Sequence, residues 1–548
     1  MEQRNSAIDP RNGFNSVTKI FHSLKPPIYL PPEHVPLSVA AFALSLRRNF
    51  PWPDSIALIH SSSGRTVSYS EFVHRTKTLA ENLRTTLGLS KGDTAFILSP
   101  NSIQIPILYF SLLTIGVVIS PVNPVSTESE IVRLIGLCKP AIAFSTSTNA
   151  HKLRNLHLKT ILTDSPEFDS MSSIPIRERE PEPMEAIRQS DLAAILYSSG
   201  TTGKVKGVML THRNLIFTTA GFYADLTERE SPAVLLYTVP YYHIFGFLYC
   251  VKSIGVNDTA VVMEKFDLGK MVKAVEEYRV SQLLLVPSVV VAMVKKAHHL
   301  KAAGHDLSSL ELVRCGAAPL GKDMAMAFKA KFPNAVLSQG YGLTETTGGV
   351  FRTDTEESLL RGSTGRLLGS SEAKIVDPET GQGLCPCQQG ELWVRGPSIM
   401  KGYIGDIDTT SAAIVSGGWL RTGDLCYIDE EGYLYVVDRL KELIKYKGYQ
   451  VAPAELEHLL QSHPQIVDAA VIPYPDEEAG QLPMAVVERR PNSNLGEEEV
   501  VEFVAKQVAP YKKIRRVAFV ESLPKSAAGK ILRNELKNMF IAPSLSKL

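Results

Sequence analysis

The sequence has few of the features that mark several protein classes. Its six cysteines are widely scattered, and Cys385-Pro386-Cys387 lacks the two-residue gap of a redox or zinc pair, which favours reduced thiols and a reducing compartment. Lys plus Arg (58) and Asp plus Glu (57) nearly cancel, so no net charge draws the chain to nucleic acid or an anionic membrane. The longest apolar stretch, residues 105–119, is broken by Pro106 and Gly116 and is shorter than the roughly 20 residues of a membrane span.

The two ends of the sequence favour a peroxisomal protein. The first 16 residues have no apolar core, so we expect no secretory signal. The last three residues, Ser546-Lys547-Leu548, form the peroxisomal address that an import receptor reads at a free carboxyl end. We therefore expect a peroxisomal location and that receptor as a partner.

Length and pattern predict an α/β protein of more than one domain, because a single core rarely grows to 548 residues. Helical patterns such as 69–87 and 268–278 alternate with short apolar runs, which favours largely parallel sheets. These runs are 94–98, 117–121, 141–145, 192–197, 235–239, 282–286 and 311–315. Short strands with glycine turns predict a β subdomain at about 365–438. We expect a large N-terminal domain, residues 1–438, and a small α+β C-terminal domain, residues 439–548.

A loop rich in glycine and hydroxyl groups follows the apolar run 192–197. It reads Ser198-Ser199-Gly200-Thr201-Thr202-Gly203-Lys204-Val205-Lys206-Gly207. Backbone N–H groups and hydroxyls of such a loop can wrap phosphate oxygens, and Lys206 can add charge. Its glycines are too closely spaced for the common P-loop, G-x-x-x-x-G-K-[ST]. An ordinary flexible loop is the alternative, but this composition directly after a buried strand favours a phosphate cradle.

Four further motifs follow in order along the chain. They are Gln339-Gly340-Tyr341-Gly342-Leu343-Thr344-Glu345, Arg421-Thr422-Gly423-Asp424, Asp438-Arg439-Leu440-Lys441-Glu442-Leu443-Ile444-Lys445-Tyr446-Lys447-Gly448 and Pro524-Lys525-Ser526-Ala527-Ala528-Gly529-Lys530. With the glycine-rich loop they resemble the adenylate-forming superfamily of acyl-CoA synthetases, beetle luciferases and peptide-synthetase adenylation domains. The resemblance is greatest to plant 4-coumarate–CoA ligases and their peroxisomal relatives, and it covers about residues 40–535.

The resemblance implies an enzyme that joins ATP to a carboxylic acid as acyl-adenylate and passes the acyl group to coenzyme A. In this assignment Glu345 holds Mg²⁺, a hard cation that prefers carboxylate and phosphate oxygens. Lys530 stabilises the negative charge that grows as pyrophosphate leaves. The remaining nucleotide contacts include the phosphate loop, with Ser198, Ser199, Gly200, Thr201, Thr202, Gly203 and Lys206. Tyr341 stacks on adenine beside Gln339, Gly340 and Gly342, and Thr344 contacts a phosphate. Asp424 and Arg439 lie at the ribose.

The transfer to coenzyme A is implied to use a different face of a mobile C-terminal domain. In the family this domain rotates about a hinge, which falls here at Lys441. Lys445 then approaches the adenylate, and Lys447-Gly448 lie along the path of coenzyme A. Lys265 matches another coenzyme A contact.

The segment Pro240-Tyr241-Tyr242-His243-Ile244-Phe245 resembles the one whose histidine closes over the substrate carboxylate. Phe245 stands where relatives specific for hydroxycinnamate usually place a tyrosine that bonds the phenol, and Tyr249 where they place a small polar residue; Ala317 is a further candidate for this pocket. A lost hydroxyl disfavours buried 4-coumarate by about 1–3 kcal/mol. We therefore expect a fatty acid, a jasmonate precursor or an unsubstituted cinnamate.

Three other functions stay open at this point: a 4-coumarate-specific ligase, a luciferase-type oxygenase and a binding protein that has kept the fold. Turnover of 4-coumarate, light emission with luciferin, and ATP binding without pyrophosphate release would identify them in that order. The expected ligands are ATP, Mg²⁺, coenzyme A and a small carboxylic acid. We expect a monomer with no nucleic-acid partner and no transmembrane segment.

Overall fold

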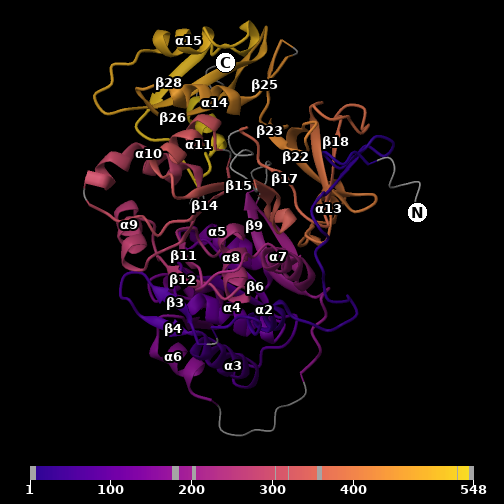
Figure 1. Cartoon of the computed structure of the whole chain (residues 1–548), viewed down its shortest axis with the longest axis vertical. Coiled ribbons are helices and arrows are strands. Elements are labelled where there is room, and N and C mark those ends of the chain that lie inside the picture. Colours follow the sequence, from indigo (N-terminus) through magenta and orange to yellow (C-terminus); the bar gives the residue numbers. More distant parts are fainter. Residues whose placement is uncertain are drawn as a thin grey trace.

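The computed structural model describes residues 8–52, 54–175, 184–199, 205–302, 304–318, 320–353, 361–447, 449–526 and 529–541, the side chains of residues 199 and 300–302 excepted. Figure 1 shows an α/β body in indigo to pink, a β subdomain in orange at its side, and a C-terminal domain in yellow above them.

The first sheet has the order β20-β10-β9-β6-β5-β7-β8, and it is parallel from β9 to β8. All five residues of β5 are buried, as a strand covered on both faces requires. Its strands are β5 (Thr94–Leu98), β6 (Val118–Val122), β7 (Ile142–Ser145), β8 (Thr160–Leu162), β9 (Leu192–Ser199), β10 (Val205–Thr211) and β20 (Gly402–Tyr403). The antiparallel strands β9 and β10 stand at the two ends of the glycine-rich loop, and β20 is the edge strand beyond β10.

The second sheet has the order β17-β16-β15-β14-β13-β11-β12-β3-β4 and is parallel from β15 to β3, with antiparallel strands at both edges. Its strands are β3 (Ile56–His60), β4 (Thr66–Ser68), β11 (Val234–Tyr237), β12 (Thr259–Val262), β13 (Gln282–Leu285), β14 (Leu312–Cys315), β15 (Val336–Leu343), β16 (Gly348–Arg352) and β17 (Arg366–Leu367). The carboxyl ends of β14 and β15 lead into the candidate site.

Helices of the α/β body join the two sheets into one core. Ile107 of α4, Leu215 of α7 and Phe247 of α8 are buried in the same cluster as Ala95 of the first sheet and Tyr237 of the second. The helices are α2 (Val39–Arg47), α3 (Tyr69–Thr85), α4 (Gln104–Thr114), α5 (Glu128–Cys138), α6 (Pro166–Ser173), α7 (His212–Ala224), α8 (Ile244–Gly255), α9 (Leu268–Glu277), α10 (Pro287–Ala302) and α11 (Lys322–Lys331). Side-chain caps such as the Thr127–Glu130 capping box begin several of them.

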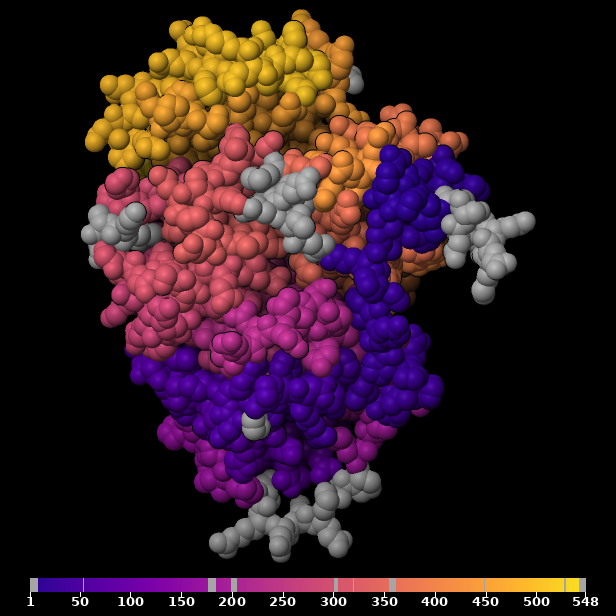
Figure 2. Space-filling model, viewed as in Figure 1, coloured from indigo at the N-terminus to yellow at the C-terminus, as the bar shows by residue number. Residues whose placement is uncertain are grey.

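The β subdomain contains strands from both ends of the N-terminal part. Its sheet has the order β1-β2-β18-β19-β22-β21, and β23 pairs with β22. The strands are β1 (Phe14–Asn15), β2 (Ile20–His22), β18 (Glu372–Val376), β19 (Gly390–Arg395), β21 (Ile414–Val415), β22 (Trp419–Ile428) and β23 (Leu434–Arg439), with helix α13 (Ile407–Ala413) beside them. The predicted range, 365–438, omits residues 14–22, whose short strands carry no periodic signal; Figure 2 shows this indigo segment against the orange surface.

The C-terminal domain is an α+β unit with its own core, which includes Ile444, Leu456 and Val500. Its sheet has the order β25-β24-β27-β26, with β28 parallel to β27. The elements are β24 (Ile444–Tyr446), β25 (Tyr449–Val451), α14 (Pro453–Ser462), β26 (Ile466–Asp476), β27 (Gly480–Arg489), α15 (Glu497–Ala505), β28 (Arg516–Val520) and α16 (Arg533–Phe540). Residues 440–443 join it to β23.

The predicted fold class is confirmed, with sheets that are mixed because antiparallel strands stand at the edges of the parallel cores. Searched over the described residues, the helices include none with the length and apolarity needed to cross a membrane. The apolar stretch 105–119 folds as buried α4 followed by the start of β6.

Candidate active site

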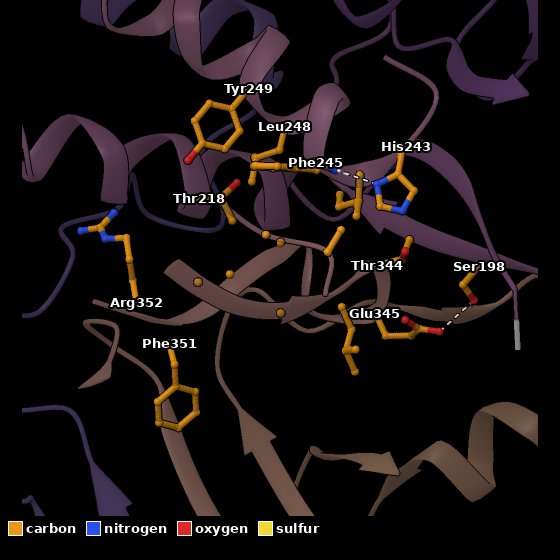
Figure 3. Close-up of a pocket in the computed structure, with 18 of the residues that line it drawn as sticks. Ser198, Thr218, His243, Phe245, Leu248, Tyr249, Thr344, Glu345, Phe351 and Arg352 are labelled. Carbon is orange, nitrogen blue, oxygen red and sulfur yellow. Dashed lines mark hydrogen bonds between the residues drawn. The ribbon is translucent and has the colours of Figure 1, made fainter. Parts of the chain in front are cut away.

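A cavity of about 600 Å³ lies where the α/β body, the β subdomain and the C-terminal domain meet. Ser198, His243 and Glu345 line it from the body, Arg439 from the β subdomain and Lys530 from the C-terminal domain. Figure 3 shows the side that lies between α8 and the β15–β16 strands. Three parts of the chain therefore contribute charged side chains to one space.

The ends of the predicted phosphate loop reach this cavity. Ser198, the next-to-last residue of strand β9, donates a hydrogen bond from Oγ to Glu345 Oε1 over 2.9 Å. Lys206 lies on β10 with Nζ 4.7 Å from the centre of the Tyr403 ring, and both residues line the cavity. Ser199 is the last residue of β9, while Gly200, Thr201, Thr202, Gly203 and Lys204 lie outside the described residues.

Glu345 is placed at the cavity wall by a single 3-10 turn, Thr344–Thr346, directly after β15. Its Oε1 accepts hydrogen bonds from Ser198 and from the Tyr403 hydroxyl, the latter over 3.0 Å. A carboxylate offers about four acceptor positions, so Glu345 keeps free capacity for a cation. The donor set therefore fits Mg²⁺ held jointly by this carboxylate and phosphate oxygens. Tyr403 was not found by sequence reasoning.

Asp424 is buried between two partners that sequence motifs had suggested separately. Tyr341 donates to Asp424 Oδ2 over 2.6 Å, and Arg439 Nε lies 3.2 Å from Asp424 Oδ1. Burial raises the pKa of Asp424, and the Arg439 guanidinium opposes this. Each oxygen of the carboxylate still has one lone pair for a further donor such as a sugar hydroxyl.

The Tyr341 ring is buried, with only 8% of its surface exposed, and its hydroxyl is directed at Asp424. Its neighbours Gly340 and Gly342 form the cavity wall instead. Gln339 also lines the cavity, where its side-chain amide donates to the Leu320 carbonyl over 3.3 Å. In this motif the glycines therefore line the cavity, whereas the Tyr341 side chain does not.

Burial shifts the charge states of His243 and Lys530 inside the cavity, and Lys530 also acts on His243. His243 is the N-cap of α8, with Nδ1 accepting from the Phe245 N–H over 3.4 Å. Burial, and next the Lys530 ammonium, lower the pKa of His243 to about 4, so the ring is neutral near pH 7. Burial, and next the Arg439 guanidinium, lower the pKa of Lys530 to about 8. Lys530 is consequently still mostly protonated at pH 7.

The predicted coenzyme A contacts lie apart from the cavity. Lys445 and Lys447 are exposed on and beside β24, and Lys441 is exposed in the connection before it. Lys265 is exposed after β12. Gly448 lies outside the described residues, as does the C-terminal Ser546-Lys547-Leu548.

The predicted acid-pocket residues lie together. The Phe245 and Tyr249 rings meet edge to face at 5.4 Å, one turn apart on α8. Ala317, which has a left-handed φ of +72°, faces the same cavity. Phe222 of α7, Arg314 of β14 and Arg352 of β16 complete this part. Sequence reasoning missed these three, because nothing in their local motifs indicates that α7, β14 and β16 converge.

Comparisons with known proteins agree with this geometry. The sequence matches the family described as AMP-binding enzyme over residues 47–404 and the AMP-binding enzyme C-terminal domain over 455–530. It is 48% identical to 4-coumarate–CoA ligase-like 9 of Arabidopsis thaliana over 99% of this chain and 98% of that protein. It is 45% identical to peroxisomal OPC-8:0-CoA ligase 1 of the same plant over 99% of this chain and 100% of that protein.

Solved structures of similar proteins share the fold of this chain. ATP-bound MatB from Rhodopseudomonas palustris superposes with a TM-score of 0.83 at 27% identity, over 92% of this chain and 99% of that one. O-succinylbenzoate coenzyme A synthetase (MenE) from Bacillus subtilis, in complex with ATP and magnesium ion, gives a TM-score of 0.79 at 28% identity. That superposition covers 90% of this chain and 99% of MenE.

Proposed function

The chain belongs to the AMP-binding enzyme family and is an ATP-dependent acid–thiol ligase of its 4-coumarate–CoA ligase-like group, and we propose that it makes acyl-CoA from an apolar acid in two steps at this cavity. The observation that carries the proposal is that Lys530, Glu345 and Arg439 line one space, with Asp424 paired to Arg439 beside it. The cations Lys530 and Arg439 oppose the negative charge of ATP, and the carboxylate of Glu345 opposes the positive charge of Mg²⁺.

In the first step an oxygen of the acid attacks the α-phosphorus of ATP, and pyrophosphate leaves as acyl-adenylate forms. Asp424 and Arg439 hold the sugar, while Ser198 and the loop after it receive the phosphates. Lys530 gives its positive charge to the oxygens on which negative charge grows, an effect that is largest in a water-poor site. Mg²⁺ on Glu345 supplies further charge neutralisation when it is bound. Neutral His243 closes the acid end without repelling Lys530.

In the second step the thiol of coenzyme A attacks the acyl carbonyl, AMP leaves, and the thiol proton passes to solvent. We assign this step to Lys445, with Lys447, Gly448 and Lys265 along the coenzyme A path. Lys530 occupies the cavity while Lys445 is exposed. A rotation of the C-terminal domain about Lys441 would exchange the two lysines, so the arrangement described above corresponds to the first step.

The acid is a fatty acid, a jasmonate precursor or a cinnamate without a ring hydroxyl. Phe245 offers no hydroxyl to a phenol, and together with Tyr249 and Phe222 it makes an aromatic wall. A relative with 45% identity is named for OPC-8:0-CoA formation and for the peroxisome. That name supports a peroxisomal location for this chain.

The test measures ATP- and coenzyme A-dependent acyl-CoA formation with hexanoate, myristate, a jasmonate precursor, cinnamate and 4-coumarate. We expect low activity on 4-coumarate, and we expect Phe245→Tyr to raise its kcat/KM at least about tenfold relative to cinnamate by restoring a hydroxyl partner. Phe50→Tyr, on the surface layer away from the cavity, is the matched control. Wild-type preference for 4-coumarate would contradict the proposed acid class, and no pyrophosphate release with any acid would contradict the two-step scheme.

A further inference from the structure

The contacts between aromatic rings show in which direction the acid pocket extends. It starts at His243, whose ring accepts from the Phe245 N–H. From Phe245 the rings continue to Tyr249 at 5.4 Å and then to Phe222 at 5.1 Å, both edge to face. Figure 3 places Tyr249 and Arg352 at the end of the pocket away from Ser198 and Glu345. An acid with its carboxylate near His243 therefore points its other end along this aromatic wall.

Arg314 lies at the far end of the wall. Its guanidinium carbon is 5.8 Å from the centre of the Phe222 ring, and the residue lines the cavity. Its Nε is buried without a hydrogen-bond partner, and within the described part of the chain the guanidinium forms no hydrogen bond or ion pair. An arginine has five N–H donors and stays charged at any working pH. Arg314 thus brings unused donors to a pocket that has an aromatic wall.

Two carboxylates of the described residues bear on the charge of Arg314: Asp225, which lines the cavity, and Asp258, which attracts Arg314 electrostatically; each of them pairs with another cation. Asp225 pairs with Arg352, and the two residues line the cavity together. Asp258 pairs with Lys252 behind the wall, over 2.5 Å. The space in front of Arg314 therefore carries an excess of positive charge, which a ligand with an acceptor oxygen would satisfy.

Gly342 and Gly348 form the floor of the pocket and carry no side chains, so a ligand has room to reach Arg314. A Cβ at Gly342 would stand 1.9 Å from the Gly348 carbonyl oxygen, so this close approach of β15 and β16 requires glycine. Gly348 itself has a φ of +102°, and a Cβ there would lie 2.6 Å from Leu248. An alkyl chain or a single ring can lie between this floor and the aromatic wall.

We propose that the acid carries an oxygen acceptor, a carbonyl or a second carboxylate, at the end opposite the reacting carboxylate, and that Arg314 binds it. The inference rests on the proposed ligase function and narrows its substrate class. A plain alkyl acid of the same length would leave the buried guanidinium without an acceptor, and a site with unpaired polar groups rejects such an analogue strongly. Arg314 is then the residue that determines specificity at this end.

The experiment compares acids of matched length with the full-length enzyme: octanoate, 7-oxooctanoate and octanedioate, and the corresponding acids of ten and twelve carbons. kcat/KM comes from pyrophosphate release, and calorimetric Kd for each acid is measured without ATP. The variants are Arg314→Met and Arg314→Lys. The matched control is Arg229→Met, because Arg229 also acts on the Lys252–Asp258 pair but pairs with Glu311.

For at least one chain length we expect wild type to prefer an oxygen-bearing acid over the alkyl acid at least about tenfold in kcat/KM and in Kd. Arg314→Met should remove the preference and improve the alkyl acid, Arg314→Lys should keep part of it, and Arg229→Met should keep all of it. The oxo and dicarboxylic arms tell a carbonyl from a carboxylate. A preference for alkyl acids at every length, or one unchanged by Arg314→Met, overturns the inference. Parallel losses for all acids would mean that Arg314 is structural. Binding still decides the matter if no acid is turned over, an outcome that would refute the ligase function instead.

Discussion

Lys530→Ala is the substitution that examines the cavity most directly. The half-buried Lys530 lines the cavity together with Glu345 and Arg439, and no other residue of the C-terminal domain brings a cation there in the described part of the chain. Loss of one preorganised group that meets developing charge costs roughly 10²–10³ in rate, or about 2.7–4 kcal/mol. We expect a loss of that size in adenylate formation, measured as ATP–pyrophosphate exchange.

The pH profile gives a second, independent measure of the same lysine. Because the pKa of Lys530 is lowered to about 8, its charged form predominates below pH 8 and disappears above it. kcat/KM for exchange should therefore be level from pH 7 to about 8 and then fall roughly tenfold per pH unit. Bound ATP favours the ammonium, so the corresponding limb in kcat should lie at higher pH. Lys445→Ala should keep the limb, and Lys530→Ala should lack it.

Two results would refute this reasoning. One is exchange by Lys530→Ala within a factor of about three of wild type. The other is an alkaline limb of unchanged position in that variant, which would assign the titration to a different group. Circular dichroism of each variant checks that the small domain is still folded.

Three further predictions concern charges elsewhere in the fold. Asp424→Asn, which keeps the shape but weakens the contacts with Arg439 and sugar hydroxyls, should raise KM for ATP about 10- to 100-fold in steady-state assays while the acid KM changes little. Lys252→Met should lower the free energy of unfolding by about 3–5 kcal/mol because Asp258 stays buried without its ion-pair partner, and the double variant with Asp258→Leu should recover most of it in urea titrations. Burial lowers the pKa of His212 to about 4, so its contribution to stability is complete above pH 6.5 and is lost as pH falls towards 4, by about 1.4 kcal/mol per unit; thermal melts of His212→Gln should lack this part of the slope.

Local patterns predicted the elements whose signal is contained in one segment. The run 94–98 is strand β5, and 268–278 differs from helix α9 by one residue, since buried strands and amphipathic helices carry their periodicity in their own sequence. The nucleotide motifs were also found because each is a short contiguous string. Their coming together could only be inferred from resemblance: the Tyr341–Asp424 contact joins residues 83 positions apart.

The acid pocket and the β subdomain were less predictable, because they depend on contacts between distant segments. Phe222, Arg314 and Arg352 stand on three different elements, and none belongs to a motif that predicts ligand contact. Tyr403 reaches Glu345 over 58 positions from a two-residue strand. Lys445 and Lys530 could be recognised from their sequence motifs. That Lys530 lines the cavity while Lys445 is exposed depends on how the small domain packs against the large one.

The pairing of β2 with β18 has a consequence for synthesis of the chain. His22 lies opposite Glu372, so a growing polypeptide must extend by 350 residues before this strand finds its neighbour. At about 5–20 residues per second, the ribosome needs roughly 20–70 s for that interval. A two-stranded hairpin is only marginally stable by itself in water, so the first strands wait as an unpaired edge during this time. A rapidly folding tag placed before residue 14 would thus compete for space at an edge that stays unpaired until β18 is made.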